Sequence, residues 1–177
     1  MDLGLKNKVA FVSASSKGLG KGCAIELAKE GAHVIISSRS EEDLIVTKKE
    51  IDKVAKGQVE YIVCDVTKPD DISNAINFAK KKFGKVDILI NNAGGPPAGD
   101  FTKMSDEDWY YAFELNLLSY IRFIREVIPE MKQQQHGRII NLASSSVKQP
   151  ISGLILSNTF RPGVVGLSKT LAEELGP

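Results

Sequence analysis

The fold of this chain is decided by the stretch V-A-F-V-S-A-S-S-K-G-L-G-K, which runs from Val9 to Lys21. Its first residues, 9–13, form a short run of β-branched and aromatic side chains that is typical of a buried strand. A glycine-containing turn follows, and an amphipathic segment begins at Gly18. Such a turn places backbone N–H groups and a helix N-terminus where they can surround a pyrophosphate. Taken alone this signal is weak, because any tight strand–helix turn can use glycine.

The alternation of short apolar runs and helix-length segments continues along the whole chain. Five strands are expected, at residues 9–13, 33–37, 59–63, 88–91 and 138–142. Five helices are expected, at residues 18–30, 41–55, 70–83, 105–131 and 157–175, with Gly31 and Gly84 as left-handed caps after the first and third. The strand runs are continuously apolar, as in strands covered on both faces. The pattern therefore predicts an α/β fold, a doubly wound (Rossmann-like) parallel sheet with helices on both faces.

Length and composition are those of an ordinary globular domain. The chain has 177 residues, 42% hydrophobic and 25% charged, with a net charge of +1. We expect residues 1–177 to form a single dinucleotide-binding domain. A net charge so close to zero predicts no nucleic-acid partner. No apolar segment approaches the ~20 residues that a membrane-spanning helix needs, so no membrane partner is expected. The opening residues lack the leader of a signal peptide, so we expect a cytoplasmic protein.

The sequence offers no cluster of metal ligands. Cys23 and Cys64 lie inside expected secondary structure, and His33 and His136 each lie alone among apolar or loop residues. We therefore expect two reduced thiols, no metal and no hydrolytic triad. The glycine-lysine-serine or -threonine phosphate loop of a kinase is absent as well.

Three later segments fit a dinucleotide site at the carboxyl ends of the strands. Asp65 follows the third expected strand, where a carboxylate can accept a hydrogen bond from an adenine amino group. The segment N-N-A-G at residues 91–94 ends the fourth, where small residues let the chain pass close to a ribose. Asn116 lies inside the long fourth helix, which is an unusual place for an asparagine with apolar neighbours.

These segments resemble the short-chain dehydrogenase/reductase family, and its 3-oxoacyl-acyl-carrier-protein reductases in particular, over essentially the whole chain. The matching motifs are S-A-S-S-K-G-L-G at 13–20, D-V-T at 65–67, N-N-A-G at 91–94, N-L-L at 116–118 and I-I-N-L-A-S at 139–144. The resemblance implies that the cofactor is bound by Ser13, Ser15, Ser16, Lys17, Gly18, Leu19, Gly20, Ser38, Arg39, Asp65, Val66, Asn92, Ala93 and Gly94. Family members usually continue through further strands and a substrate-covering segment, which we expect residues 1–177 to lack.

The glycine turn departs from the family pattern T-G-x-x-x-G-x-G at its first two positions, which are Ser13 and Ala14 here. Serine can supply the hydroxyl of threonine. Alanine adds a Cβ in a tight turn, which costs free energy if the residue needs a positive φ. We expect cofactor binding that is weakened or slightly re-aimed by Ala14.

The choice of cofactor is indicated at the end of the second strand. Members of the family that prefer NAD carry an acidic residue there for the adenosine 2′-hydroxyl. This chain has Ser38 and Arg39 instead, with Lys17 in the phosphate turn. Two cations and a hydroxyl suit a 2′-phosphate, so NADP(H) is expected in preference to NAD(H), with NAD(H) possible. The alternative is that Arg39 points into solvent.

The catalytic positions of the family are only partly kept. The resemblance assigns Asn116 to a water relay and Ser144 to substrate orientation, while Ser157 and Arg161 stand where the family has its tyrosine and lysine. A serine hydroxyl is shorter and far less acidic than a phenol. Pro162 is expected to disfavour helical geometry at Arg161. The tyrosines of the preceding helix, Tyr110, Tyr111 and Tyr120, are expected only to pack.

Two functions from different classes follow. The first is an NADP(H)-dependent oxidoreductase that interconverts a carbonyl and an alcohol on a small-molecule substrate, with proton delivery through Ser144, Ser157 or water. The second is a catalytically silent nucleotide-binding protein with a structural or regulatory role. In either case the apolar excess of the helix at 105–131 predicts a homodimer or homotetramer through this helix and the last one. The alternative is a long helix buried in the core of one subunit.

Overall fold

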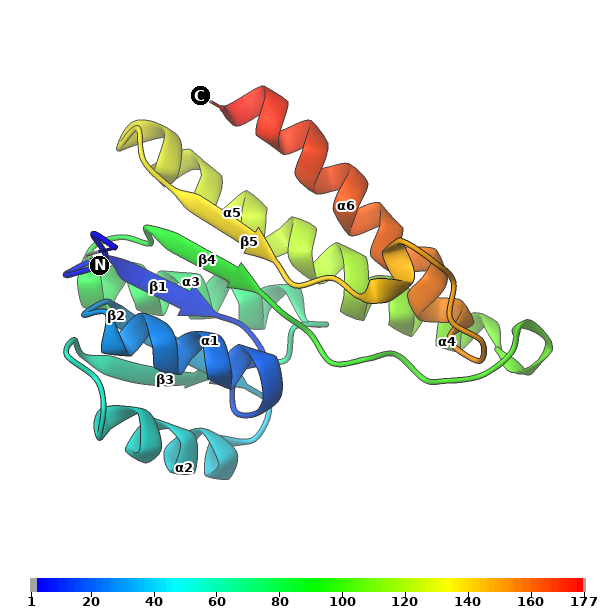
Figure 1. Ribbon diagram of the computed structural model, residues 1–177, viewed down its shortest axis with the longest axis horizontal. Coiled ribbons are helices and arrows are strands. Elements are labelled where there is room, and N and C mark those ends of the chain that lie inside the picture. Colours follow the sequence, from blue (N-terminus) through cyan, green and yellow to red (C-terminus); the bar gives the residue numbers. More distant parts are fainter. Residues whose placement is uncertain (1–2, 177) are drawn as a thin grey trace.

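The computed structural model describes residues 3–176 and contains one five-stranded sheet. Its strands are β1 (Val9–Val12), β2 (His33–Ser38), β3 (Val59–Val63), β4 (Ile88–Asn91) and β5 (Arg138–Asn141). The order across the sheet is β3-β2-β1-β4-β5, and all neighbouring strands pair in parallel (Figure 1). The predicted doubly wound parallel sheet is therefore confirmed, with strand boundaries within one residue of those expected.

Helices follow the strands in the predicted order. They are α1 (Gly18–Lys29), α2 (Glu41–Asp52), α3 (Pro69–Phe83), α4 (Asp106–Phe113), α5 (Ser119–Gln133) and α6 (Ile155–Leu175). A π-helical turn, η2 (Glu114–Leu118), joins α4 to α5, and two short 3₁₀ turns are η1 (Phe101–Lys103) and η3 (Ser145–Val147). The predicted glycine caps are confirmed, because Gly31 and Gly84 have φ values of 89° and 80°. No helix within residues 3–176 combines the length and apolarity that crossing a bilayer requires.

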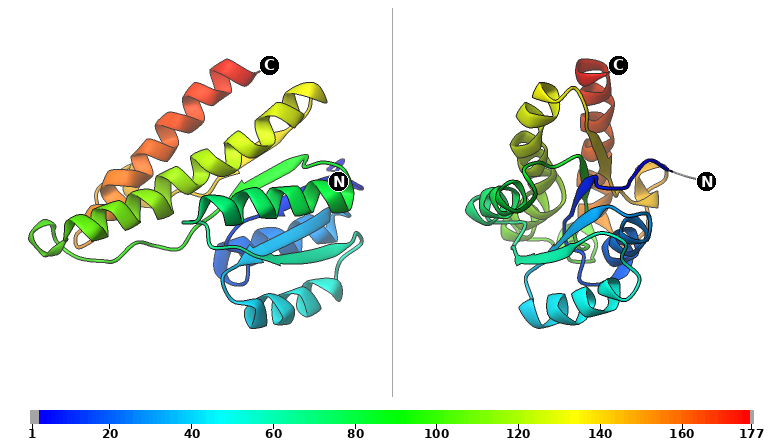
Figure 2. Two further views of the ribbon diagram at one scale, coloured as in Figure 1. Left: turned by 180° about the vertical axis from the view of Figure 1, so that it is seen from behind. Right: turned by 90° about the vertical axis from the view of Figure 1, so that its left-hand side faces the viewer.

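Side chains of β1 divide the hydrophobic core into two layers, because successive residues of a strand face opposite sides. Val9 and Phe11 pack against α3, α5 and part of α6, whereas Ala10 and Val12 pack against α1 and α2. The front and back views show α1 on one face of the sheet and α3 with α5 on the other (Figures 1 and 2). β5 differs from the expectation of strands covered on both faces, since Ile140 is 49% exposed. Within the described residues β5 is an edge strand, paired only with β4.

The carboxyl ends of β1 and β4 lie side by side where the strand order reverses. Val12 is opposite Ile90, and the Ser13 N–H donates to the Ile90 carbonyl over 3.1 Å. The connection after β1 leads to α1 on one face, and the connection after β4 leads to helices on the other. Open α/β sheets bind ligands in the crevice formed at such a point.

The helix predicted over residues 105–131 is present, running without a break from Asp106 to Gln133, but a π turn that the sequence did not predict widens it in the middle. α4 ends at Phe113, the wide turn occupies Glu114–Leu118, and α5 begins at Ser119. The Ser119 hydroxyl donates to the Leu115 carbonyl over 2.7 Å and so bonds the backbone inside the wide turn. π turns of this kind are rare and are frequently found at functional sites. Apolar periodicity cannot reveal them, because it remains helical on both sides.

The expectation that Pro162 disfavours helical geometry at Arg161 is wrong. α6 begins at Ile155, two residues before the predicted start, and continues through Pro162 to Leu175. Proline removes one backbone hydrogen bond from a helix interior. The packing of Val164, which is 1% exposed, and the side-chain bonds of Arg161 hold the helix on the sheet across this gap.

Candidate active site

Two glycines shape the turn between β1 and α1 for different reasons. Gly18 has a φ of 61°, and a Cβ there would meet nothing within 4 Å, so the backbone conformation alone requires glycine. A Cβ on Gly20 would instead lie 2.7 Å from Nδ2 of Asn92 and 2.8 Å from the Ala14 carbonyl oxygen. The missing side chain of Gly20 therefore lets the turn lie directly against the segment that follows β4.

The strain expected at Ala14 is present. Its φ is 46°, in the left-handed region that favours glycine. The carbonyl of Ala14 accepts a 2.9 Å hydrogen bond from Nδ2 of Asn92, which fixes the strained residue against β4. The turn thus keeps the geometry that the family's glycine provides, at the cost of a crowded Cβ.

Replacing Ala14 by glycine should raise the free energy of unfolding by about 1 kcal/mol. Left-handed geometry costs a residue with a Cβ roughly 1–2 kcal/mol, and the greater freedom of glycine in the unfolded chain offsets part of the gain. Urea denaturation measures the change. Ala24→Gly, in the interior of α1, is the matched control and should destabilise the protein, because that position is helical and fully buried. A lower free energy of unfolding for Ala14→Gly than for the unchanged protein would contradict the inference that Ala14 is strained.

Ser13 and Ser15 hold the turn from behind. The Ser13 hydroxyl donates to the Asn92 carbonyl over 2.7 Å and accepts from the Asn92 N–H over 2.8 Å. The Ser15 hydroxyl donates to the Val12 carbonyl over 2.7 Å and accepts from the Ser37 N–H over 3.0 Å. Both serines are buried, so they position the cleft and do not line it.

A cleft of about 580 Å³ opens at the carboxyl ends of β1, β2, β3 and β4. Most of the predicted cofactor residues line it, namely Ser16, Lys17, Gly18, Leu19, Ser38, Arg39, Asp65, Val66, Asn92, Ala93 and Gly94. Ser13, Ser15 and Gly20 lie behind this lining. Ala14, which the sequence analysis singled out in the glycine turn, also lines the cleft. The sequence interpretation missed further lining residues, which are Ser40, Asp43, Cys64, Gly95, Tyr111 and Leu115. These come from turns and helix faces that carry no motif of their own.

The lip of the cleft beyond β2 carries mixed charges. Lys17 lies 3.7 Å from a carboxylate oxygen of Asp43, and the Lys17 side chain is 85% exposed. Asp43 is held in the first turn of α2, where its N–H donates to the capping hydroxyl of Ser40 over 3.2 Å. Arg39 is exposed at the same lip. Lys17 is thus shared between Asp43 and any anion that enters the cleft.

Asp65, just after β3 in the lining of the cleft, is poised as an ionised acceptor. Partial burial raises its pKa, but hydrogen bonds from the Thr67 N–H and hydroxyl, at 3.0 and 2.8 Å, act in the other direction. The charges of Arg39 and Lys68 add to them, so the pKa of Asp65 lies below its ordinary value. A carboxylate held in this way can accept a hydrogen bond from an amino group at neutral pH.

Asn116 and Arg161 meet on the Gly94 carbonyl, just beyond β4. Nδ2 of Asn116 donates to this oxygen over 2.9 Å, and Nη2 of Arg161 lies 3.4 Å from it. Asn116 is fully buried in the middle of the π turn. Its Oδ1 has no hydrogen-bond partner within residues 3–176. The structure therefore brings together two of the four predicted catalytic residues.

The Arg161 guanidinium is held by neutral oxygens. Nη1 donates to the Tyr120 hydroxyl over 2.9 Å and to the Leu142 carbonyl over 2.8 Å, and Nη2 also lies 3.4 Å from the Ala93 carbonyl. The residue is 6% exposed, and within the described part of the chain no carboxylate forms an ion pair with it. Arg161 thus places a positive charge among the carbonyl dipoles at the ends of β4 and β5.

Tyr120 does more than the packing predicted for it. Its hydroxyl donates to the Leu142 carbonyl over 2.8 Å while it accepts from Arg161, whose guanidinium carbon lies 5.9 Å from the centre of the ring. Burial raises the pKa of Tyr120 and outweighs the opposing effect of Arg161, so the phenol stays protonated. Tyr120 therefore positions Arg161. The sequence feature that could have indicated this role is the spacing of Tyr120, four residues after Asn116, which places both on one helical face.

The two predicted serines form a separate group around Ser146, which the sequence interpretation did not single out. The Ser144 hydroxyl accepts from the Ser146 N–H over 3.1 Å and caps η3. The Ser157 hydroxyl lies 3.4 Å from the Ser146 hydroxyl, and Ser157 is 7% exposed. The structure thus brings Ser144 and Ser157 together through Ser146. Residues 3–176 contain no group of three His, Cys, Asp or Glu side chains placed to hold a metal ion.

Comparison with known sequences agrees with this geometry. A sequence profile of the family described as short chain dehydrogenase matches residues 8–177. The chain belongs to the short-chain dehydrogenase family. The resemblance expected from the glycine turn, D-V-T and N-N-A-G is therefore confirmed.

Short-chain dehydrogenases from several organisms are similar to this chain. An uncharacterized oxidoreductase of Bacillus subtilis is 34% identical over 173 residues, which are 98% of this chain and 65% of that protein. The 3-oxoacyl-acyl-carrier-protein reductase of Thermotoga maritima is 32% identical over 97% of this chain and 69% of its own length. The crystal structure of L-sorbose reductase from Gluconobacter frateurii, complexed with NADPH and L-sorbose, superposes with a TM-score of 0.95 and 31% identity, over 99% of this chain and 66% of that one. The chain thus spans about two thirds of the length of these relatives, or slightly less for the first.

Proposed function

We propose that this protein is an NADP(H)-dependent oxidoreductase that interconverts a carbonyl and an alcohol, similar to 3-oxoacyl reductases. The observation that carries the proposal is the meeting of Asn116 and Arg161 on the Gly94 carbonyl, at the end of a dinucleotide-sized cleft. A buried amide and a buried guanidinium at this point have no evident use in a protein that only binds a nucleotide. The activities named for the Thermotoga and Gluconobacter relatives support the same reaction class.

The cleft suits a dinucleotide that carries a 2′-phosphate. The turn at Gly18 and Gly20 leaves room for a pyrophosphate against backbone N–H groups, which a Cβ at Gly20 would disturb. Arg39 and Lys17 at the lip supply the charge-assisted donors that a phosphate prefers. Ionised Asp65 would accept from the adenine amino group. The ion pair between Asp43 and Lys17 would reduce the preference for NADP(H) over NAD(H) without reversing it.

Hydride transfer is the chemistry that NADP(H) supplies when bound. The chain's own residues would orient the substrate oxygen and move its proton. The Ser144 oxygen accepts from the Ser146 N–H, so the Ser144 proton remains available to a substrate oxygen. Arg161 would maintain a positive field beside the reacting atoms, and Ser157, Ser146 or water would carry the proton.

The reaction is tested by following NADPH consumption with a panel of ketones and 3-oxoacyl thioesters, beside NADPH binding measured by fluorescence. Turnover of at least one carbonyl, lost in Asn116→Ala, is the expected result. Binding without consumption of NADPH for any carbonyl would overturn the proposal.

One observation favours a second function, a catalytically silent nucleotide-binding protein. The residue in the tyrosine position, Ser157, is buried against Ser146 and offers no phenol to a substrate. This reading predicts NADPH binding with no carbonyl reduction, which is the outcome that would overturn the first.

Arg39→Asp should reverse the cofactor preference from NADP(H) to NAD(H). The change removes a cation from the 2′-phosphate site and places a carboxylate where a free 2′-hydroxyl is recognised. Fluorescence titration of both cofactors with both proteins measures the ratio of affinities, which should shift by at least about tenfold, or 1.4 kcal/mol. Lys148→Asp, at an exposed position outside the cleft, is the control. Equal affinities before and after the Arg39 change would contradict the assignment.

We also propose that the protein forms a homodimer or homotetramer through the outer surface of α4, α5 and α6. Phe101 and Tyr110 are 69% and 72% exposed. Phe101 lies edge-on to Trp109, and Trp109 to Phe160, so the exposed ring of Phe101 belongs to an aromatic cluster that includes residues of α4 and α6. Exposed aromatic surface of this kind is typical of association sites.

Sedimentation of the full-length protein at micromolar concentration should therefore give a dimer or tetramer. Tyr110→Glu should shift the equilibrium towards the monomer, because it places a charge on the apolar surface. Glu42→Lys, an exposed change on α2 outside that surface, is the control and should leave the equilibrium unchanged. A monomeric wild-type protein would count against the proposal.

A further inference from the structure

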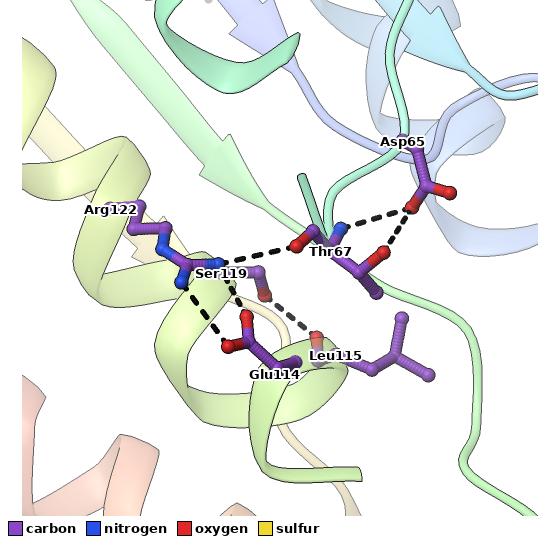
Figure 3. Close-up of polar contacts among 6 residues, drawn as sticks. All are labelled: Asp65, Thr67, Glu114, Leu115, Ser119 and Arg122. Atoms are coloured by element: carbon purple, nitrogen blue, oxygen red, sulfur yellow. Dashed lines mark hydrogen bonds and ion pairs between the residues drawn. The ribbon is translucent and has the colours of Figure 1, made fainter. Parts of the chain in front are cut away.

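Arg122 and Glu114 form a forked ion pair across the π turn (Figure 3). Nη1 of Arg122 donates to Oε2 of Glu114, and Nη2 donates to Oε1 over 3.2 Å. Two parallel bonds fix the plane of the guanidinium relative to the carboxylate, which a single contact would not do. The two side chains are 18% and 34% exposed, so the pair is partly shielded from water.

The spacing of eight residues makes this pair depend on the π turn. In an uninterrupted α-helix, residues eight apart point about 80° away from each other around the axis. A π turn accommodates about one extra residue, so the pair behaves as if it were seven apart and about 20° from alignment. Two long side chains then lie along one face and meet end to end. The fork and the wide turn therefore stabilise each other.

The same guanidinium reaches the turn between β3 and α3. Nη1 of Arg122 also donates to the Thr67 carbonyl over 3.3 Å. Thr67 in turn holds the carboxylate of Asp65 through its N–H and hydroxyl, at 3.0 and 2.8 Å. A continuous hydrogen-bonded path thus runs from a wall of the cleft to the first residue of the π turn (Figure 3).

Asn116 lies just beyond the end of this path, in the same π turn. It lies two residues after Glu114 in the π turn, and its amide nitrogen donates to the Gly94 carbonyl over 2.9 Å. The direction of that side chain depends on the wide turn being kept. Neither Glu114 nor Arg122 lines the cleft, so neither is placed to touch a bound nucleotide.

We propose that Arg122 and Glu114 are positioning residues that couple occupation of the adenine-binding turn to the π turn and Asn116. The inference rests on the proposed function, because it takes Asp65 to face the adenine. A ligand bonded to Asp65 fixes the turn at Thr67, and the ordered Thr67 carbonyl holds the Arg122 guanidinium on Glu114. Without the ligand this turn is less constrained, and the π turn opens more readily.

Hydrogen exchange with half of the cofactor tests the coupling. The probe is adenosine 2′,5′-bisphosphate, which carries the adenine and the 2′-phosphate but no nicotinamide half. In the wild-type protein it should slow exchange of the backbone amides at 114–119 by at least about tenfold. In Arg122→Met the probe should still bind, but this slowing should be lost.

Two further variants sharpen the test. Arg122→Lys keeps the charge but cannot form the fork, so it should also lose the slowing, and it keeps the test valid if Arg122→Met fails to fold. Arg125→Met changes an exposed arginine on the same helix, and in this variant the probe should still slow exchange at 114–119. Leu115 lines the cleft, so direct contact with the probe is the rival explanation for any slowing.

The outcomes separate this inference from the proposed function. If the probe binds the wild-type protein without slowing exchange at 114–119, or if the slowing survives in Arg122→Lys, the coupling is refuted while the cofactor site stands. If the probe does not bind the wild-type protein at all, the cofactor assignment fails and the coupling fails with it.

Discussion

Gly20→Ala is expected to weaken NADPH binding at least about tenfold and to lower the free energy of unfolding by about 1–3 kcal/mol, the usual cost of forcing an extra methyl group into a close-packed site. The added Cβ would lie 2.7 Å from Nδ2 of Asn92 and 2.8 Å from the Ala14 carbonyl oxygen. These two atoms are bonded to each other over 2.9 Å, so the methyl group would push apart the contact that joins the turn to β4.

The chain contains a matched control for this change. Gly22 lies two residues later on α1, and a Cβ there would meet nothing within 4 Å. Gly22→Ala should therefore leave NADPH binding unchanged and stabilise the helix, since alanine is favoured over glycine by about 1 kcal/mol in a helix interior. Fluorescence titration and urea denaturation of both variants measure the two effects. Equal behaviour of the two variants would show that the turn does not need its close approach to Asn92.

Replacing Ser157 by tyrosine and Arg161 by lysine together is expected to raise the rate of carbonyl reduction at least about tenfold, a conservative bound because a positioned general acid typically contributes about 10²–10⁴-fold. Tyrosine would supply a phenol of suitable reach at position 157. A lysine ammonium at position 161 has donors for the Tyr120 hydroxyl and the Leu142 carbonyl, with one left for a ligand. It would also lower the pKa of the new phenol.

Neither single change should suffice, because the two groups act as a unit. Ser157→Tyr alone leaves the guanidinium spread over four oxygens, and Arg161→Lys alone leaves no phenol. The measurement is the ratio kcat/KM for the two single variants and the double variant. A double variant that folds, binds NADPH and shows no gain on any carbonyl would favour the silent nucleotide-binding protein.

The cleft proposed for the cofactor could be predicted from the sequence because each of its motifs occupies a few consecutive residues. The turn at residues 13–20, Asp65 and the N-N-A-G segment each follow a strand, and the carboxyl ends of parallel strands meet at one edge of the sheet. Order and spacing along the chain therefore sufficed to group them. Even the strain at Ala14 followed from one residue type in a tight turn, and its φ of 46° agrees.

For the proposed catalytic residues, the sequence predicted which positions to consider but not the contacts that they make. Sequence spacing placed Ser157 and Arg161 on one helical face, but not the partners that hold them. Tyr120 is 41 residues from Arg161, and Ser146 is 11 residues from Ser157. Such contacts depend on how α5 and α6 pack over the sheet, which no local pattern encodes.

The sequence by itself determined the sheet, the order of its elements and the glycine turn that we propose as the dinucleotide site, because strand hydrophobicity and glycine geometry act over a few residues. Only the tertiary structure decided that the long helix widens at Glu114–Leu118. A π turn gives up regular backbone bonds. The Arg122–Glu114 fork and the Ser119 hydroxyl compensate from the helix itself, and the Thr67 carbonyl holds the fork from a distant part of the chain. That widening, and with it the direction of Asn116, follows from contacts between elements and not from the residues of the helix alone.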